Sequence, residues 1–146
     1  MHASGPFSNT GPIPPRANQA TTYTILLSVQ GGGNAVAGGV LSTVLPSYVT
    51  YTGLTTGTGT FSYDAGAHTV TWNTGDLAQG TSAQGAFQVS VTPSTSQKGS
   101  APPLTSILSF SGYDRFAGVQ VSATANPVTT DTPQDPGYVS SNANVQ

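Results

Sequence analysis

A strand-like alternation around the single tryptophan is the feature that most constrains the fold of this chain. His68, Val70 and Trp72 fall on one parity, and the threonines and asparagine between and after them fall on the other. Because successive side chains of a β-strand point to opposite faces, this pattern predicts a half-buried strand with Val70 and Trp72 facing a core. Residues 73–76 (Asn-Thr-Gly-Asp) are turn formers and are expected to end the strand, with Leu77 packed beneath the turn.

The same alternation recurs along the chain between segments rich in Gly, Pro, Asn and Ser. Residues 21–30 are the clearest case, since Tyr23, Ile25, Leu27 and Val29 share one parity. We expect further strands at residues 36–45 (with a bulge at Gly38-Gly39), 48–51, 61–63, 86–92, 104–110 and 119–125, and loops at residues 53–59, 93–103 and 112–118. About seven to nine short strands separated by turn signals predict an all-β fold, a single immunoglobulin-like antiparallel β-sandwich.

The alternating positions also predict which residues form the core of this sandwich. The expected core is Tyr23, Ile25, Leu27, Leu45, Val70, Trp72, Phe87, Val89, Val91, Ile107 and Val121. Three parts are expected along the chain: an extended Gly/Pro-rich leader or edge strand at residues 1–20, the sandwich at residues 21–126, and a polar tail or last edge strand at residues 127–146.

Composition narrows the function classes. Charged residues make up 5% of the 146 residues, the formal net charge is −2, and Lys and Arg together number 3. Nucleic-acid binding and binding to anionic membranes are therefore not expected, because both depend on clusters of Lys and Arg. Cys is absent, so neither disulfides nor thiolate metal sites can form. No segment has the roughly 18 apolar residues of a membrane-spanning helix, and the first residues lack the pattern of a signal peptide.

Several short motifs occur in an order that is typical of a known repeat module. They are Tyr23-Thr24-Ile25, Leu45-Pro46, Tyr63-Asp64, residues 70–77 (Val-Thr-Trp-Asn-Thr-Gly-Asp-Leu) and residues 87–93 (Phe-Gln-Val-Ser-Val-Thr-Pro). Over roughly residues 11–146 the chain resembles the repeat module known as domain of unknown function 11, an immunoglobulin-like sandwich of bacterial and archaeal surface proteins. Residues 97–99 and 135–140 are most similar to versions in large surface proteins of uncultivated ultra-small bacteria. The Gly31-Gly32-Gly33 turn departs from the polar turn usual in such modules.

The resemblance implies a non-catalytic function, because the family has no catalytic signature. We expect a non-enzymatic structural or adhesion module at the cell surface, acting as a spacer or scaffold, with its signal or anchor outside this chain. Two alternatives are a self-assembling fibre subunit that adds a terminal strand to a neighbour, and a carbohydrate-binding module. Partners would be neighbouring modules or identical subunits, with surface glycans under the last alternative; no cofactor, nucleic acid or membrane insertion is expected.

Few side chains are candidates for a site. Tyr113, Asp114, Arg115 and Phe116 lie together in a predicted loop and form the candidate contact surface. Asp131 and Asp135 are weak candidates for Ca²⁺, which needs six to eight oxygen ligands.

Three other residues have a structural interpretation. Trp72 is expected in the core rather than on a sugar-binding surface, because it shares parity with Val70. His68 is expected to be a solvated strand residue that could pair with Asp64. Lys98 lies in a polar loop, so an isopeptide bond inside the core is not expected.

The terminal segments suggest a hypothesis for how copies of this chain assemble. An open sandwich leaves unpaired edge strands, which accept added strands. We expect a terminal segment to pack along a sheet edge, either its own or a neighbour's, with Ile13, Tyr138, Val139 and Val145 filling pockets. Prolines at residues 12, 14 and 15 weaken the leader as a donor, so the tail is the favoured segment.

Overall fold

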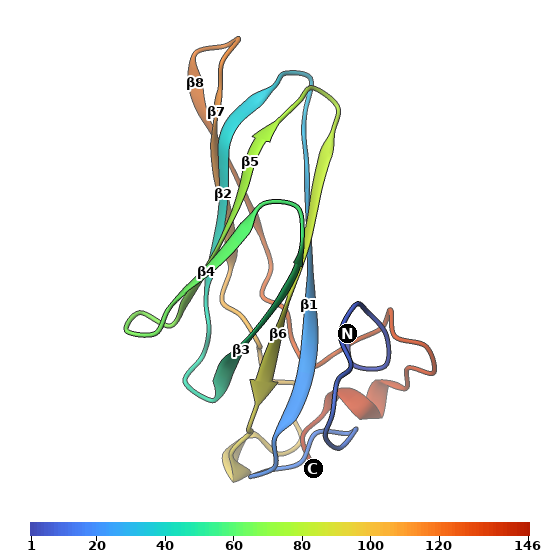
Figure 1. Cartoon of the computed structure of the whole chain (residues 1–146). Coiled ribbons are helices and arrows are strands. Elements are labelled where there is room, and N and C mark those ends of the chain that lie inside the picture. The colour runs from blue at the N-terminus through green and yellow to red at the C-terminus, as the bar shows by residue number, and fades with distance from the viewer.

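A computed structural model describes all 146 residues and shows the all-β sandwich that the sequence predicts (Figure 1). Its strands are β1 (Thr21–Gln30), β2 (Val36–Val44), β3 (Val49–Gly57), β4 (Thr60–Asp64), β5 (Thr69–Leu77), β6 (Ser82–Val91), β7 (Leu108–Asp114) and β8 (Val119–Ala125). Two short 3₁₀ helices, η1 (Thr95–Gln97) and η2 (Ser140–Ala143), lie in the connecting and terminal segments. None of the helices has the length and apolar character needed to span a bilayer.

The strands form two layers of unequal width. One sheet has three strands in the order β1-β6-β3, and the other has five in the order β4-β5-β2-β7-β8. Every strand pair is antiparallel. Between the layers, Tyr51 of β3 stacks on Tyr63 of β4, with ring centroids 4.9 Å apart. Gly85 of β6 lies on the Trp72 ring of β5, where a Cβ atom would come within 2.9 Å. Thus β3 covers β4, and β6 covers β5.

The core is centred on Trp72, which is fully buried. Its ring stacks on Phe61 at a centroid distance of 5.6 Å, and its Nε1–H donates to the carbonyl oxygen of Thr58 at 2.7 Å. Nine expected core residues are buried: Tyr23, Ile25, Leu27, Leu45, Val70, Trp72, Phe87, Val89 and Val91. The hairpin of β4 and β5 pairs Phe61 with Trp72 and Tyr63 with Val70.

Two expected core residues are placed differently. Ile107 is 57% exposed, because Leu108 beside it takes the inward direction and a shift of one residue reverses the face. Val121 is only half-buried, since no strand of the opposite layer covers it.

Three strands run further than the local sequence predicts. β3 continues through residues expected to be a loop, and its register on β6 shifts between Tyr51 and Thr55. β5 continues through the expected turn to Leu77, with Gly75 opposite Gly39 at the bulge of β2. β7 likewise continues to Asp114. In each case pairing with a neighbouring strand satisfies the backbone, which overrides the local preference of Gly, Asn and Asp for turns.

Both terminal segments pack on the chain's own domain. The backbone N–H of Thr24 donates to the carbonyl of Met1 at 2.8 Å, and the Met1 ammonium donates to the carbonyl of Thr24 at 2.7 Å. Thr22 N–H donates to the carbonyl of Thr10 at 2.8 Å, so the leader, rather than the tail, lies along the β1 edge. The tail instead closes one end of the sandwich, where Val145 is 1% exposed.

Candidate interaction site

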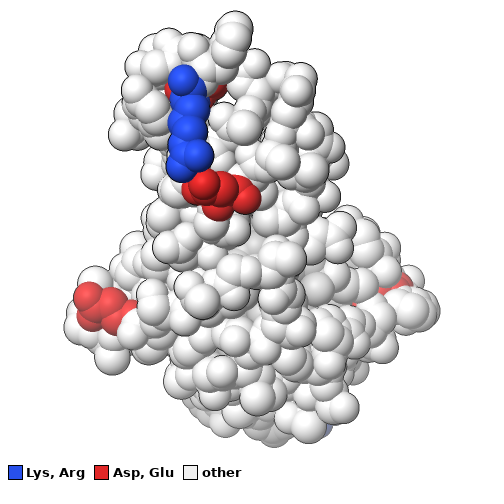
Figure 2. All heavy atoms as spheres, turned by 45° about the horizontal axis from the view of Figure 1, so that its top comes forward, with Lys and Arg blue, Asp and Glu red and all other residues white.

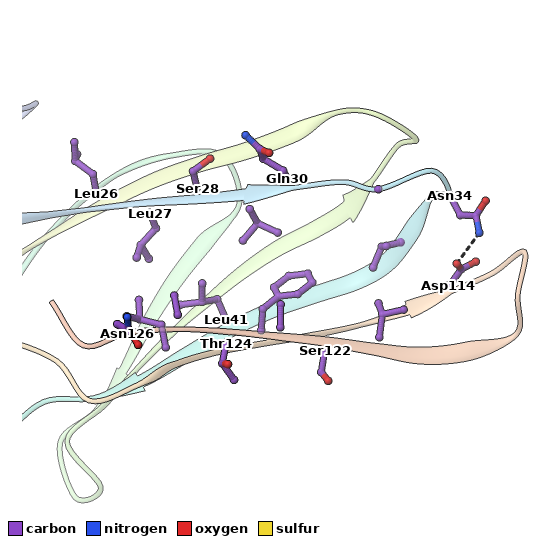
Figure 3. Close-up of a pocket in the computed structure, with 18 of the residues that line it drawn as sticks. Leu26, Leu27, Ser28, Gln30, Asn34, Leu41, Asp114, Ser122, Thr124 and Asn126 are labelled. Atoms are coloured by element: carbon purple, nitrogen blue, oxygen red, sulfur yellow. Dashed lines mark hydrogen bonds between the residues drawn. The ribbon is translucent and has the colours of Figure 1, made fainter.

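The three-stranded layer stops two strands short of the five-stranded layer. With β3 over β4 and β6 over β5, the strand order places β1 over β2. Leu27 of β1 and Leu41 of β2 point toward each other across the interlayer space (Figure 3). β7 and β8 therefore have no facing strand, and the side of the sandwich between β1 and β8 is open.

A cleft of about 610 Å³ occupies this open side. Its walls come from residues 26–30 of β1 and residues 121–125 of β8, and apolar side chains form its floor. Those floor residues are Leu27, Val29, Val36, Leu41, Leu108 and Phe110. The cleft is therefore an extension of the core that remains open to solvent.

β8 presents an uncovered apolar stripe to this cleft. Its register pairs Ala125 with Leu108, Ala123 with Phe110 and Val121 with Gly112, so all three β8 residues share the inward face of β7. Ala123 and Ala125 are exposed although they point toward the interior of the sandwich, whereas Ser122 and Thr124 point outward (Figure 3). The alternation of small apolar residues from Val119 to Ala125 was visible in the sequence; the lack of a covering strand was not.

The facing rim of the cleft is a row of free backbone groups on β1. Thr22 and Thr24 direct their backbone groups outward to the leader. In an antiparallel strand every second residue points the same way, so Leu26, Ser28 and Gln30 also direct theirs outward. None of these three takes part in a backbone hydrogen bond to the leader or to any loop. The cleft thus combines an apolar floor with unused donors and acceptors at one rim.

The hairpin tip between β7 and β8 contains the candidate contact residues. One of them, Asp114, has a structural role instead. Asp114 is buried; it accepts hydrogen bonds from the Asn34 side chain at 2.8 Å and from the N–H groups of Phe116 and Ala117, each at 2.9 Å. The N–H of Ala117, the Asn34 amide and the Phe116 N–H hold the pKa of Asp114 below its ordinary value. Asp114 is therefore a turn-stabilising residue rather than a contact residue.

The other residues of the tip are accessible. Phe116 is 89% exposed and Tyr113 is 43% exposed, and Arg115 forms an exposed ion pair of 3.0 Å with Asp76. Glycan contact at this tip stays a prediction. In Figure 2 a basic side chain lies against an acidic one, and wide uncharged surface separates this pair from the other acidic side chains in view, as the low charge content implies.

The remaining candidates serve structural roles. Asp135 accepts hydrogen bonds from the His2 N–H and the Ser4 hydroxyl, and Asp131 accepts one from the Tyr138 hydroxyl. No group of three or more His, Cys, Asp or Glu side chains that could hold a metal ion is present.

The expected His68–Asp64 pair is not formed. Asp64 instead accepts from the N–H groups of Gly66 and Ala67 in its own turn, and His68 Nδ1 lies 3.4 Å from the Tyr63 hydroxyl. The Asp64 carboxylate is already bonded within its own turn, and the His68 ring lies beside Tyr63 instead.

The expected pocket-filling residues of the tails divide into two groups. Val145 is buried within its own domain, where its N–H and C=O bond to Ser100 and Gly99, both at 2.9 Å. Ile13 and Val139 are 37% and 53% exposed, and Tyr138 is half-buried. The tail is thus anchored at its last residues, and Val128 is the one tail residue that lines the β1–β8 cleft.

The contact between the leader and Asp135 predicts a pH dependence. Burial acts to raise the pKa of Asp135, but hydrogen bonds from His2 and Ser4 outweigh it and lower the pKa below the ordinary 3.8. Burial also lowers the pKa of His2 below 6.5. In both cases the unfolded chain binds protons more readily. Their stabilising contribution is therefore complete above about pH 6.5, declines as His2 begins to protonate, and is lost as the pH falls through the folded pKa of Asp135.

Urea unfolding between about pH 7 and pH 3 checks this prediction. We expect Asp135→Asn to flatten the acid part of the stability profile and His2→Ala to flatten the part that begins near pH 6.5. Asp76→Asn is the control, because its carboxylate lies in an exposed ion pair. If the stability profiles of Asp135→Asn and His2→Ala both parallel that of the wild type, as the control profile should, these two groups do not cause the pH dependence.

Comparison with known proteins supports the fold. No family model matches the chain, and neither does any curated protein sequence. Among solved structures, the chain is similar to the major pilin subunit BcpA of Bacillus cereus, with a TM-score of 0.52 and 12% identity over 80% of this chain. It is also similar to the major pilin SpaD of Corynebacterium diphtheriae, with a TM-score of 0.50 and 12% identity over 79% of this chain.

A third similar structure holds the N-terminal domains of the type V pili tip protein Mfa5 of Porphyromonas gingivalis, with a TM-score of 0.51 and 11% identity over 66% of this chain. The chain spans 36%, 31% and 22% of the BcpA, SpaD and Mfa5 structures, respectively. At these identities the similarity establishes a shared β-sandwich architecture.

Proposed function

We propose that this chain is a non-catalytic structural module of a cell-surface assembly, and that its open side associates with another β-structured polypeptide. The observation that carries the proposal is the cleft between β1 and β8, where an apolar floor lies beside free backbone groups. A bound β-strand satisfies both features at once, since it offers backbone donors and acceptors along its edge and side chains on its face.

The first and last segments of the sequence lie against each other. Gln146 donates its N–H to the carbonyl of Pro15 at 2.8 Å, and Ala17 N–H donates to the carbonyl of Gln146 at 2.9 Å. Both ends lie in the same half of the molecule, while the β7–β8 tip lies at the opposite end (Figure 1).

The similar structures support a surface assembly. Two are pilin subunits and one is a pilus tip protein, so this sandwich architecture occurs in subunits of surface fibres. The low charge of this chain and its many Thr and Ser residues fit the same setting.

Antibodies against residues 1–146 test the proposed location. We expect them to label intact source cells, with the antigen released by surface shearing in material of higher mass than one chain. An antibody against an abundant cytoplasmic enzyme is the control for lysis. Labelling that appears only after cell disruption would remove the proposed function.

A further inference from the structure

We propose that two copies of this chain close each other's open side in a two-fold symmetric dimer, with β1 of each copy paired to β8 of the other. This inference rests on the proposed function for its biological setting. The strand order, the strand register and the exposure of β1 and β8 favour this dimer.

The strand counts of the two layers are complementary. In one copy the short layer ends at β1, and the long layer extends past it by β7 and β8. A two-fold axis parallel to the strands continues each three-stranded sheet into the five-stranded sheet of the other copy. The partner's β8 and β7 then lie over β7 and β8, the two strands that lack a cover. Both layers become complete, and every strand has a facing strand.

The strand directions agree with this arrangement. β2 follows β1 through a turn and runs back in the opposite direction (Figure 1), β7 is antiparallel to β2, and β8 is antiparallel to β7. β8 therefore runs opposite to β1. A two-fold axis parallel to the strands preserves strand direction, so β1 and the partner's β8 pair in the antiparallel sense that every other pair in the molecule uses.

The side chains that would meet differ in size at each level. The register places Leu108 beside Ala125, Phe110 beside Ala123 and Gly112 beside Val121. Rotation about an axis parallel to the strands leaves the position of each residue along that axis unchanged. Phe110 thus lies over the partner's Ala123, and Gly112 lies under the partner's Val121. Large residues facing small ones is the arrangement that lets two sheets interdigitate.

The four sheet edges differ in protection, and β8 is the least protected. β4 is a strand of 5 residues that ends at Asp64, and β3 carries an irregular register. The leader covers β1 at Thr22 and Thr24. β8 has 7 residues without charge or proline, and its edge is bare. Since exposed, uncharged edges accept further strands, β8 is the edge expected to pair.

Neither the leader nor any charged side chain blocks the approach of the partner's β8. The leader bonds to β1 at Thr22 and Thr24, whereas the cleft begins at Leu26, so the partner's β8 meets only the free part of the edge. Asp114 is the only ionisable side chain that lines the cleft, and Asn34 and the hairpin turn already satisfy its carboxylate. The two-fold axis therefore brings no unpaired like charges together, which makes a second copy the favoured occupant.

A charge on the inner face of β8 tests the interface. Ala123 is exposed in the single chain, so Ala123→Lys leaves the fold intact, but in the dimer the ammonium would be buried against the partner's Phe110. We expect the wild type to sediment as a dimer and Ala123→Lys to weaken dimerisation by at least about a hundredfold. Ser62→Lys, exposed on the distant edge strand β4, is the matched control and is expected to dimerise as the wild type does.

Single cysteines distinguish this pairing from pairing of like edges. The chain has no Cys of its own. We expect Ser122→Cys to form a disulfide-linked heterodimer with at least one of Leu26→Cys, Ser28→Cys and Gln30→Cys when the proteins are mixed and oxidised, and no variant to cross-link alone.

Three results would overturn the proposal: a wild type that remains monomeric at about millimolar concentration, an Ala123→Lys variant that dimerises normally, or cross-linking of one variant with itself in place of the mixed product. None of these bears on the cell-surface labelling above, so the two proposals fail separately.

Discussion

Replacing Trp72 with alanine is expected to lower the free energy of unfolding by about 3–5 kcal/mol, the range for truncating a large buried aromatic side chain. Trp72 is fully buried, stacks on Phe61 and donates to the carbonyl of Thr58. Truncation removes the ring from the centre of the core and leaves that carbonyl without its partner. Since single domains have a free energy of unfolding of about 5–15 kcal/mol, this one change removes a large part of the stability.

The measurement is urea unfolding followed by far-ultraviolet circular dichroism, because Trp72 is the only tryptophan and its fluorescence disappears with it. Trp72→Phe is the matched variant: it keeps an aromatic ring and loses the hydrogen bond. We expect it to cost less than the alanine variant. An alanine variant as stable as the wild type would contradict the central position of this residue.

Deleting residues 142–146 is expected to cost about 3–5 kcal/mol, because the deletion removes buried side chains together with hydrogen bonds. Ala143 is 5% exposed and Val145 is 1% exposed. The carbonyl of Ala143 accepts from the Thr130 hydroxyl at 2.7 Å, and Val145 joins the backbone of Gly99 and Ser100. The tail therefore closes one end of the core rather than acting as a free strand.

Urea unfolding at neutral pH measures this loss. Val139→Ala is the control, because Val139 is 53% exposed in the same tail and a surface truncation usually changes stability by less than about 0.5 kcal/mol. If the deleted chain unfolds at the same urea concentration as the wild type, the tail contributes nothing to the folded domain. The hypothesis that it is available for a neighbour would then regain support.

Local pattern was sufficient for the strands and for most of the core. Tyr23, Val70, Trp72 and Val89 are buried because polar and apolar residues alternate around them, and a strand can bury only one parity on the core face. Ile107 shows the limit of this argument. It is adjacent to Leu108, both are apolar, and the sequence contains nothing local that decides which of the two points inward.

The candidate site depends on contacts that no local pattern contains. Asp114 has the sequence context of an exposed loop residue, yet Asn34, distant in sequence, comes within hydrogen-bond distance and makes it part of a turn. The extension of β3 and β5 through Gly- and Thr-rich residues likewise depends on pairing with β6 and β2.

The sequence by itself determined that the chain forms short amphipathic strands in a two-layer sandwich, because side-chain alternation and turn residues act locally. Only the tertiary structure decided how the strands divide between the layers. That division of three against five leaves β7 and β8 without a cover and exposes the inward stripe of Val121, Ala123 and Ala125. Strand order depends on long-range hydrogen bonding between edges, and any strand edge is chemically able to pair with any other. The alternation of β8 is therefore the same whether its face is covered or open.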